Sequence, residues 1–332
     1  MGSTAIATKG SRPALRLVST KDMSREAWLD VRKGGIGSSD AAAAVGLNPY
    51  QSQLELWLVK TGQDADLPKI DPTDDSTPVY WGSLLEPIVA AAYTKRTGNK
   101  VRRINSVLQN PDPDKSWMLA NLDYTVVGAD VQILECKTAG LNGARLWQEG
   151  VPEYIQLQVQ HQLAVTNKLA ADVCVLVCGQ EIRVHRIDRD EVLIGRLIEL
   201  ERKFWHYVET DTPPPADGSD SAAMALQCLY PHDHGSTLDL TDDTTMSAAF
   251  ADLVAVRSEI DIRAQVEAEL KQKIQQRMGD ASRAKFQTGD VSWKRSKDGL
   301  GLDVTTLLKE RPELLSTYPL VRPGSRRFLV NT

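Results

Sequence analysis

The chain has 332 residues, of which 42% are hydrophobic and 25% charged, and its formal net charge is −5. This composition is ordinary for a soluble globular protein of about two domains, and the acidic balance excludes a protein held on nucleic acid by bulk charge alone. No apolar run approaches the roughly 20 residues that span a bilayer, and the N-terminal segment lacks the compact apolar stretch of a secretory signal, so we expect an intracellular protein without membrane contact.

Helix signals dominate the first hundred residues. Three short helices are expected over MSREAWLDVRKG, GSSDAAAAVG and SQLELWLVKTG, because each has a capping residue, an apolar stretch and a closing glycine. The polar and proline-containing segment QDADLPKIDPTDDSTP is typical of a loop. A longer helix is then expected over VYWGSLLEPIVAAAYTKRTG, with Pro87 tolerated in its early turns.

From Val101 the apolar period changes to two, which indicates strands. We expect strands over VRRINSVLQN, WMLANLDYTVVG and VQILECKTA, with GAD as a tight hairpin turn between the last two. There follow a helix over VPEYIQLQVQHQLAVTN, strands over ADVCVLVCG and EIRVHRID, and a helix over RDEVLIGRLIELERKFWHYVETD. This order predicts an α/β (α+β) fold with helices flanking a mixed central β-sheet.

Composition divides the chain into four parts. We expect residues 1–20 to be flexible, residues 21–212 to form the first folded domain, and the proline-rich and serine-rich residues 213–243 to form a linker. The remaining residues 244–332 form a mainly helical C-terminal extension, in which helical apolar spacing from Met246 to Met278 predicts a long amphipathic helix or a hairpin of two. A small β element around a short helix is expected over AKFQTGDVSWKRS and GSRRFLV.

Charged residues interrupt the apolar strand ILECKTA. Residues two apart in a strand point to the same face, so Glu135 and Lys137 share one face. A hairpin closed at GAD brings Asp123 near Glu135. Two carboxylates suit a hard divalent cation such as Mg²⁺ or Mn²⁺, and a neighbouring lysine stabilises the negative charge that develops in phosphodiester hydrolysis. The alternative is a surface salt bridge on an edge strand.

Several ordered segments strengthen the first interpretation. The chain resembles the YqaJ-type viral recombinase family, which includes the bacteriophage lambda exonuclease and belongs to the PD-(D/E)XK nuclease superfamily. The resemblance covers roughly residues 24 to 208, and the first proline of the superfamily motif is replaced by the sequence NLD. It rests on the segments WLDVRKGGIGSSDAAAAVGLNPYQSQLELWLVKTG, WGSLLEPIVAAAYTKRTG, MLANLDYTVV, ILECKT and QLQVQHQLAVT.

This resemblance implies a metal and catalytic site. The implied ligands of Mg²⁺ or Mn²⁺ are Asp123, Glu135, Glu86 and the backbone carbonyl of Cys136, and Lys137 completes the implied catalytic set. Gln158 matches the glutamine on the helix behind the site. Gln160 is its rival, because residues two apart on a helix do not face the same cleft.

The resemblance also implies a site for a terminal 5′ phosphate at Arg32, Ser38 and Ser39. In physical terms, the glycines of RKGGIGSSD would let the backbone approach an anion, the next helix would present its N-terminus, and Arg32 would supply a forked donor. The alternative is a glycine-rich turn between helices, with Ser39 as a cap.

Taken together, the resemblance implies a Mg²⁺-dependent 5′-to-3′ exonuclease that resects double-stranded DNA ends for phage-type single-strand annealing recombination in the cytoplasm of a bacterial host cell. The implied partners are duplex DNA ends, a single-strand annealing protein and further copies of the chain, with a trimer as one form. Two alternatives remain open: an endonuclease or repair nuclease built on the same core, and a DNA-binding assembly protein without catalytic activity.

Overall fold

The computed structural model describes residues 13–320, 324 and 326–331. The chain divides into two compact units, the first ending at Tyr230 and the second beginning at Pro231. Of the segment predicted to be flexible, residues 1–12 lie outside the described residues, whereas β1 (Leu15–Ser19) is an ordered strand that pairs with β3 (Ser106–Gln109). Each unit is described by itself below.

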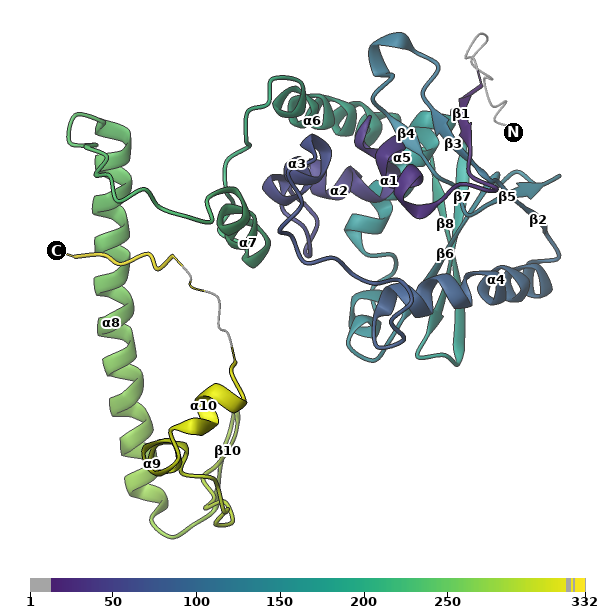
Figure 1. Cartoon of the computed structure of the whole chain (residues 1–332). Coiled ribbons are helices and arrows are strands. Elements are labelled where there is room, and N and C mark those ends of the chain that lie inside the picture. The colour runs from purple at the N-terminus through teal and green to yellow at the C-terminus, as the bar shows by residue number, and fades with distance from the viewer. Residues whose placement is uncertain (1–12, 321–323, 325, 332) are drawn as a thin grey trace. The chain divides into compact units, whose positions relative to one another are not determined.

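The first unit is built on a five-stranded mixed sheet (Figure 1). The strand order is β2-β5-β6-β7-β8; β6 and β7 run parallel, and every other neighbouring pair is antiparallel. The parallel pair requires a crossover, which α5 (Glu153–Thr166) supplies after the short 3₁₀ helix η3 (Gly143–Trp147). The strands are β2 (Lys100–Arg103), β5 (Tyr124–Val127), β6 (Ile133–Ala139), β7 (Ala170–Val177) and β8 (Glu181–Asp188).

Helices cover both faces of this sheet. On one face, α4 (Pro78–Thr97) packs Val89 and Tyr93 against Leu134 of β6. On the other face, α5 packs Val159 and Leu163 against the alternate residues of β6 and β7. The expected fold class, a mixed sheet flanked by helices, is therefore confirmed.

A second helical layer lies over α5 (Figure 1). Ser24 and Ser52 cap α1 and α3 as their sequences indicate, since each side chain accepts a hydrogen bond from the first turn. The elements are α1 (Arg25–Lys33), the 3₁₀ helix η1 (Ser38–Asp40), α2 (Ala41–Ala44), α3 (Gln53–Thr61) and α6 (Glu191–Glu209).

Two of the predicted strands are each divided in the structure. VRRINSVLQN forms β2 in the central sheet and β3 in a separate three-stranded sheet of order β1-β3-β4. WMLANLDYTVVG likewise forms β4 (Leu119–Ala120) in the small sheet and β5 in the central one, and the 3₁₀ helix η2 (Pro113–Lys115) precedes β4. The apolar alternation continues across both breaks, so periodicity alone did not reveal that the chain changes sheets.

The predicted linker contains a helix of the first unit. Helix α7 (Asp220–Leu229) buries Ala222 and Ala225, and Ser221 within it donates a hydrogen bond to Glu55 of α3 at 2.5 Å. The proline-rich segment 213–215 therefore leads to one more packed helix, and the first unit ends some twenty residues later than residue 212. Small residues are compatible with a linker, but here they allow close helix packing.

The second unit contains one continuous helix, α8 (Thr244–Met278), and no hairpin of two helices. A β-hairpin follows, formed by β9 (Arg283–Phe286) and β10 (Gly289–Ser292), and then α9 (Val304–Glu310) and α10 (Glu313–Thr317). The segment GSRRFLV forms no strand over its described residues 324 and 326–330. Across the described residues, no helix combines the length and apolar content needed to cross a membrane.

Candidate active site

The candidate site lies where two strands of the central sheet diverge. β5 pairs with β6 only at Tyr124↔Leu134 and Thr125↔Ile133, so β6 continues beyond this pairing toward Ala139. Asp123, immediately before β5, accepts a hydrogen bond from the backbone N–H of Cys136 at 2.8 Å through its Oδ2. The carboxylate of Asp123 thus accepts the hydrogen bond from β6 that a backbone carbonyl of a longer β5 would otherwise accept. This contact holds Asp123 beside the charged residues of β6.

Glu135 is the most constrained side chain of the site and is only 3% exposed. Its Oε1 lies 2.8 Å from Nζ of Lys137 and accepts a hydrogen bond from Nε2 of Gln158 at 2.5 Å. Its Oε2 accepts a hydrogen bond from Nε2 of Gln162 at 2.7 Å. A buried carboxylate with donors on both oxygens is fixed in orientation, as a catalytic or metal-binding group must be.

Asp123, Glu135 and Lys137 line one pocket of about 270 Å³ between α4 and β6. Glu86 of α4 reaches the same pocket as Asp123, Glu135 and Lys137, and its Oε1 accepts a hydrogen bond from Arg103 of β2 at 2.8 Å. The structure therefore brings together all four charged residues that the sequence assigned to a metal and catalytic site. They come from a helix, a loop and a strand that are separated by up to 51 positions in the sequence.

Negative charge is concentrated in this pocket. The pKa of Asp123 is raised well above its ordinary value, first by burial and then by the nearby charge of Glu135. Burial also raises the pKa of Glu86, although the charge of Arg103 opposes this shift. Burial alone would lower the pKa of Lys137, but the charges of Glu135 and Asp123 outweigh it and raise the pKa, so the ammonium stays protonated at neutral pH.

The donor set fits a hard divalent cation. Three carboxylates and the backbone of β6 offer oxygen atoms, and burial together with the charge of Glu135 raises the pKa of both Asp123 and Glu86. Among the described residues, however, no three His, Cys, Asp or Glu side chains already converge closely enough to hold an ion by themselves. A cation here would therefore also need water or substrate oxygen atoms, and Mg²⁺ in proteins usually keeps several waters beside one or two carboxylates.

Helix α5 presents Gln158, and not Gln160, to this site. Gln158 accepts a hydrogen bond from Lys137 at 3.0 Å through Oε1 while it donates to Glu135. Gln160 points elsewhere: it donates to the carbonyl of Asp188 at 2.8 Å and accepts from the backbone N–H of Asp190 at 3.1 Å. The two side chains therefore perform different tasks on the same helix.

Gln162 also contacts the site, and sequence reasoning missed it. Its side chain is fully buried and donates to Glu135, while its Oε1 has no hydrogen-bond partner in the described part of the chain. Because only the amide N–H₂ can donate to the carboxylate, the orientation of this amide is fixed. The spacing of four between Gln158 and Gln162 was an available signal, since such residues share one face of a helix.

A buried ion pair holds α5 in place behind the site. His161 is fully buried; its Nδ1 lies 2.6 Å from Oε1 of Glu201 on α6, and its Nε2 lies 2.9 Å from the carbonyl of Leu119 on β4. Burial alone would lower the pKa of His161, but Glu201 outweighs it and raises the pKa. His161 thus joins α5 to α6 and β4. These contacts fix the position of α5, and with it the positions of Gln158 and Gln162 relative to Glu135.

The residues expected to bind a terminal phosphate form a separate cluster. Nη2 of Arg32 donates to Oγ of Ser39 at 2.6 Å and to Oδ1 of Asp40 at 2.5 Å, and the guanidinium lies 4.7 Å from the ring centre of Trp28. Lys60 approaches the other oxygen of Asp40 at 2.6 Å. Arg32 and Lys60 exceed the single charge of Asp40 by one, but the other charged residues of their pocket, two lysines and three carboxylates, balance this excess. Ser38 of the same turn is buried.

The charge of Asp40 is stabilised strongly in this cluster. Burial alone would raise the pKa of Asp40, but the charges of Arg32 and Lys60 outweigh it and hold the pKa well below its ordinary value. Arg32 and Lys60 line a pocket of about 370 Å³, and none of its lining residues belongs to the carboxylate pocket. An anion bound here would have to share the guanidinium of Arg32 with Asp40.

The glycines of this turn serve packing. A Cβ on Gly35 would lie 2.5 Å from the carbonyl oxygen of Trp117 and 2.7 Å from the side chain of Leu119. A Cβ on Gly37 would lie 3.1 Å from Oδ2 of Asp40 and 3.3 Å from Arg32. Gly35 therefore leaves room for a neighbouring segment of the protein, and Gly37 leaves room for the Arg32–Asp40 pair. Packing alone accounts for a glycine at both positions.

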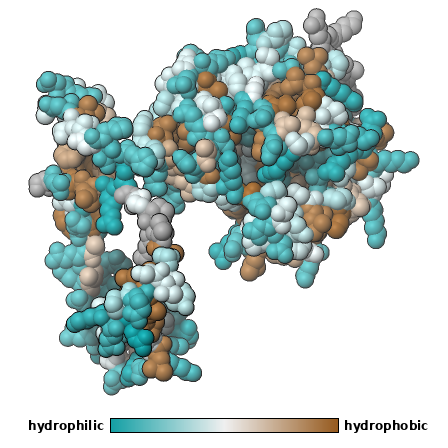
Figure 2. All heavy atoms as spheres, viewed as in Figure 1, coloured by the Kyte–Doolittle hydropathy of each residue, from teal (hydrophilic) through white to brown (hydrophobic). Residues whose placement is uncertain are grey.

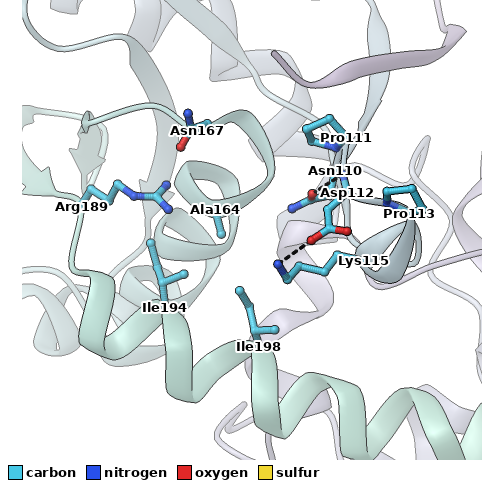
Figure 3. A pocket seen from close by; sticks show the side chains of 10 residues that line it. All are labelled: Asn110, Pro111, Asp112, Pro113, Lys115, Ala164, Asn167, Arg189, Ile194 and Ile198. Carbon is cyan, nitrogen blue, oxygen red and sulfur yellow. Dashed lines mark hydrogen bonds and ion pairs between the residues drawn. The ribbon is translucent and has the colours of Figure 1, made fainter. Parts of the chain in front are cut away.

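A further pocket, of about 420 Å³, lies between the loop 110–115, the end of α5 and the start of α6 (Figure 3). Its charged side chains are paired within the protein: Lys115 lies 2.8 Å from Asp112, and Arg189 donates to Glu191 and to the carbonyl of Leu163. None of its lining residues belongs to either charged cluster described above. This hollow therefore offers no reactive group.

Comparison with known proteins adds an independent observation. The YqaJ-like viral recombinase domain matches residues 27–169. The "Uncharacterized protein YqaJ" of Bacillus subtilis (strain 168) is 34% identical over 289 residues, which cover 86% of this chain and 88% of that protein. Because this match is longer than the first unit, the likeness extends into the second unit and beyond the segment 24 to 208 noted in the sequence.

Two solved structures are similar over somewhat more than half of the chain. An alkaline exonuclease (LHK-Exo) from Laribacter hongkongensis has 21% sequence identity and a TM-score of 0.47, covering 56% of this chain and 93% of that one. A phage related exonuclease from Haemophilus somnus 129PT has 10% identity and a TM-score of 0.37, covering 53% and 96%. By the extent and identity of its match to the Bacillus protein, together with the domain match, this chain belongs to the YqaJ-like viral recombinase family.

Proposed function

We propose that this protein is a divalent-metal-dependent deoxyribonuclease that degrades duplex DNA from its 5′ ends. The observation that carries the proposal is the pocket in which Glu86, Asp123, Glu135 and Lys137 meet. Carboxylates beside a lysine are the groups that phosphodiester hydrolysis needs, and a surface salt bridge would not require two glutamine amides to orient a buried glutamate. Membership of a viral recombinase family supports DNA as the substrate.

Asp123, Glu135 and Glu86, with the carbonyl of Cys136, are the groups that would hold Mg²⁺ or Mn²⁺. A bound ion of this kind supplies a more acidic coordinated water and neutralises charge at a phosphodiester. In the structure, the guanidinium of Arg103 pairs with Glu86 and so neutralises part of the negative charge that the ion would neutralise. Burial and the charge of Glu135 raise the pKa of Asp123, and we expect a bound ion to offset both effects.

The chain's own residues contribute position and charge. Lys137 stays protonated between Glu135 and Gln158, so its ammonium can donate to a phosphate oxygen or to the attacking water and stabilise the negative charge that develops there. Gln158 and Gln162 keep both oxygens of Glu135 oriented. The site stands on β6 and α5, and rigid elements position groups more accurately than loops do.

The 5′ polarity rests on the second cluster. Arg32, Ser38 and Ser39 would bind a terminal 5′ phosphate, with the guanidinium of Arg32 turning from Asp40 to the phosphate. In this proposal the terminal phosphate lies in the Arg32 cluster while an adjacent phosphodiester lies at the carboxylate pocket. Resection of duplex ends would then provide single strands for an annealing protein, and further copies of the chain, a trimer among the possible forms, would surround the DNA.

Digestion of labelled DNA tests the proposal directly. A 5′-labelled linear duplex and a covalently closed circle are incubated with Mg²⁺, with Mn²⁺ and with a chelator. We expect nucleotides to be released from the linear duplex only when a divalent ion is present, while the circle stays intact. Cleavage of the circle would indicate an endonuclease, and no metal-stimulated release from either DNA would indicate a binding protein without catalytic activity.

The variant Lys137→Ala assigns this activity to the pocket. Removing one positioned electrostatic group costs on the order of 10²-fold or more in rate, so we expect digestion to fall by at least this amount while DNA binding persists. Lys115→Ala is the matched control, because Lys115 forms an ion pair of the same 2.8 Å length with Asp112 outside the site. Near-normal digestion by Lys137→Ala would remove Lys137 from the mechanism.

A further inference from the structure

The long helix of the second unit exposes apolar side chains along its length. Figure 2 shows hydrophobic residues interrupting the hydrophilic surface of α8, and the exposed fractions are 51% for Val256, 59% for Ile260 and 57% for Leu270. A helix of 35 residues is about 52 Å long. Its C-terminal residue Met278 is buried within the unit, but the apolar side chains of the middle turns remain accessible to solvent.

These apolar residues follow a repeat of seven. Met246, Leu253, Ile260 and Ile274 occupy the first core position, and Ala249, Val256 and Leu270 the second core position, three residues later. The position farthest from this seam holds only small or uncharged residues, namely Ala251, Ser258, Gln265 and Gln272. An apolar seam that repeats every seven residues is the pattern of a helix that packs along its length against another helix. Apolar residues also lie outside this seam, among them Ile262, which is 59% exposed.

Between Val256 and Ile274 two charged residues interrupt the seam, and they have opposite signs; a third, Arg277, occupies the second core position near the end of the helix. Arg263 occupies the second core position of one repeat, and Glu267 occupies the first core position of the next. The two residues lie at equal distances along the chain before and after Gln265. In a parallel pair of α8 helices, each of these residues would meet its own copy across the seam, which places like charges together. A parallel pair is therefore disfavoured.

An antiparallel pair centred on Gln265 resolves this conflict. Residues equally far before and after Gln265 then face each other, so Arg263 meets Glu267 of the second copy, and the symmetry repeats the contact. In the same register Ile260 meets Leu270, and Val256 meets Ile274. Every seam residue from Val256 to Ile274 thus faces a residue of matching chemistry. Outside this central stretch, Leu253 faces Arg277.

The flanks of this pair are mostly compatible. On one side Glu259 comes near Lys273 of the second copy, and Val266 comes near its own counterpart. On the other side Arg257 approaches Lys271, which is less favourable, but Lys271 is already paired with Glu267 at 2.6 Å within the helix. The attractive seam contacts outnumber this one repulsive flank contact.

We propose that α8 is a self-association surface that pairs antiparallel with α8 of a second copy of this chain. The occupant is a second copy because the charge pattern of α8 is complementary to its own reversed sequence. The pairing is independent of the nuclease site, and it joins two copies whatever contacts the first units make. It gives the second unit a function in assembly, bringing two nuclease units into one particle.

Charge reversal in the full-length chain tests this assignment. The mass in solution is measured by analytical ultracentrifugation at two protein concentrations. We expect Arg263→Glu and Glu267→Arg each to reduce the mass of the particle to half, because each variant places like charges at the centre of the pair. The double variant Arg263→Glu with Glu267→Arg restores the complementarity, so it should regain the wild-type mass.

Two further variants complete the test. Ile260→Asp should halve the mass without rescue, whereas Gln265→Glu, on the face away from the seam, should leave the mass unchanged. Far-ultraviolet circular dichroism of each variant checks that the helix persists. The proposal is overturned if the wild type and Ile260→Asp have the same mass, which would mean that α8 packs on its own chain or on a different partner, or if the double charge reversal fails to restore the mass.

Discussion

Replacing Gln162 with methionine separates a role in the site from a role in stability. Methionine has nearly the same length as glutamine, so no large cavity is created. The change removes the hydrogen bond to Oε2 of Glu135, and a hydrogen bond to a charged group contributes about 1.5–3 kcal/mol. It also removes the buried Oε1 of Gln162, which has no partner among the described residues and costs about 1–3 kcal/mol.

These two effects have opposite signs and similar sizes. We therefore expect the free energy of unfolding of Gln162→Met to stay within about 1 kcal/mol of the wild type. Glu135, however, loses the donor that orients one of its oxygens. Loss of a group that orients a metal ligand typically lowers metal affinity or activity by about 10- to 100-fold, and we expect a loss of this size in Mg²⁺-dependent digestion.

Gln160→Met is the matched control, since it changes the same residue type two positions earlier on α5. Gln160 has both polar atoms of its amide paired, with the backbone of Asp188 and of Asp190. Its replacement should cost about 1–3 kcal/mol of stability, because two backbone groups lose their partners, and should leave the Mg²⁺ dependence unchanged. Urea unfolding and a Mg²⁺ titration of activity measure the two quantities. The reasoning fails if Gln162→Met digests DNA normally at every Mg²⁺ concentration.

Three further outcomes are expected. Asp40→Asn should lower stability at pH 7 by roughly 3–5 kcal/mol, because it leaves the buried Lys60 without its partner. The folded pKa of Asp40 is depressed, so its stabilisation is present above the ordinary value of 3.8 and is lost as the pH falls through the folded pKa; the urea midpoints of wild type and Asp40→Asn should therefore converge in acid. Arg32→Ala should erase most of any preference for 5′-phosphorylated over 5′-hydroxyl ends, roughly 10-fold or more, and Arg32→Lys should restore only part of it; an unchanged ratio of the two rates would exclude Arg32 from end recognition. Mg²⁺ or Mn²⁺ should raise the melting temperature of the wild type but not of Glu135→Gln, and equal shifts in both would place the metal elsewhere.

The sequence determined the main elements of the first unit because their signals are local. Ser24 and Ser52 begin helices, Gly62 and Gly98 adopt the left-handed conformation that ends them, and the period of two identifies the strands. Periodicity did not reveal the change of sheet after Arg103 or before Tyr124, because a strand has the same alternation whichever sheet it joins. The helix α7 was missed for a similar reason, since small residues suit both a linker and a closely packed helix.

At the candidate site, the sequence determined which charged residues are available, and the strand period placed Glu135 and Lys137 on one face. Only the tertiary structure decided their neighbours. It brought Glu86 and Asp123 into the same pocket, selected Gln158 over Gln160 and added Gln162, because the rotation of α5 about its axis is fixed by packing and by the buried His161–Glu201 contact. It also showed that Arg32 is already engaged by Asp40 and Lys60. Contacts between residues distant in the chain depend on how helices pack on the sheet, and no local pattern of residues records that geometry.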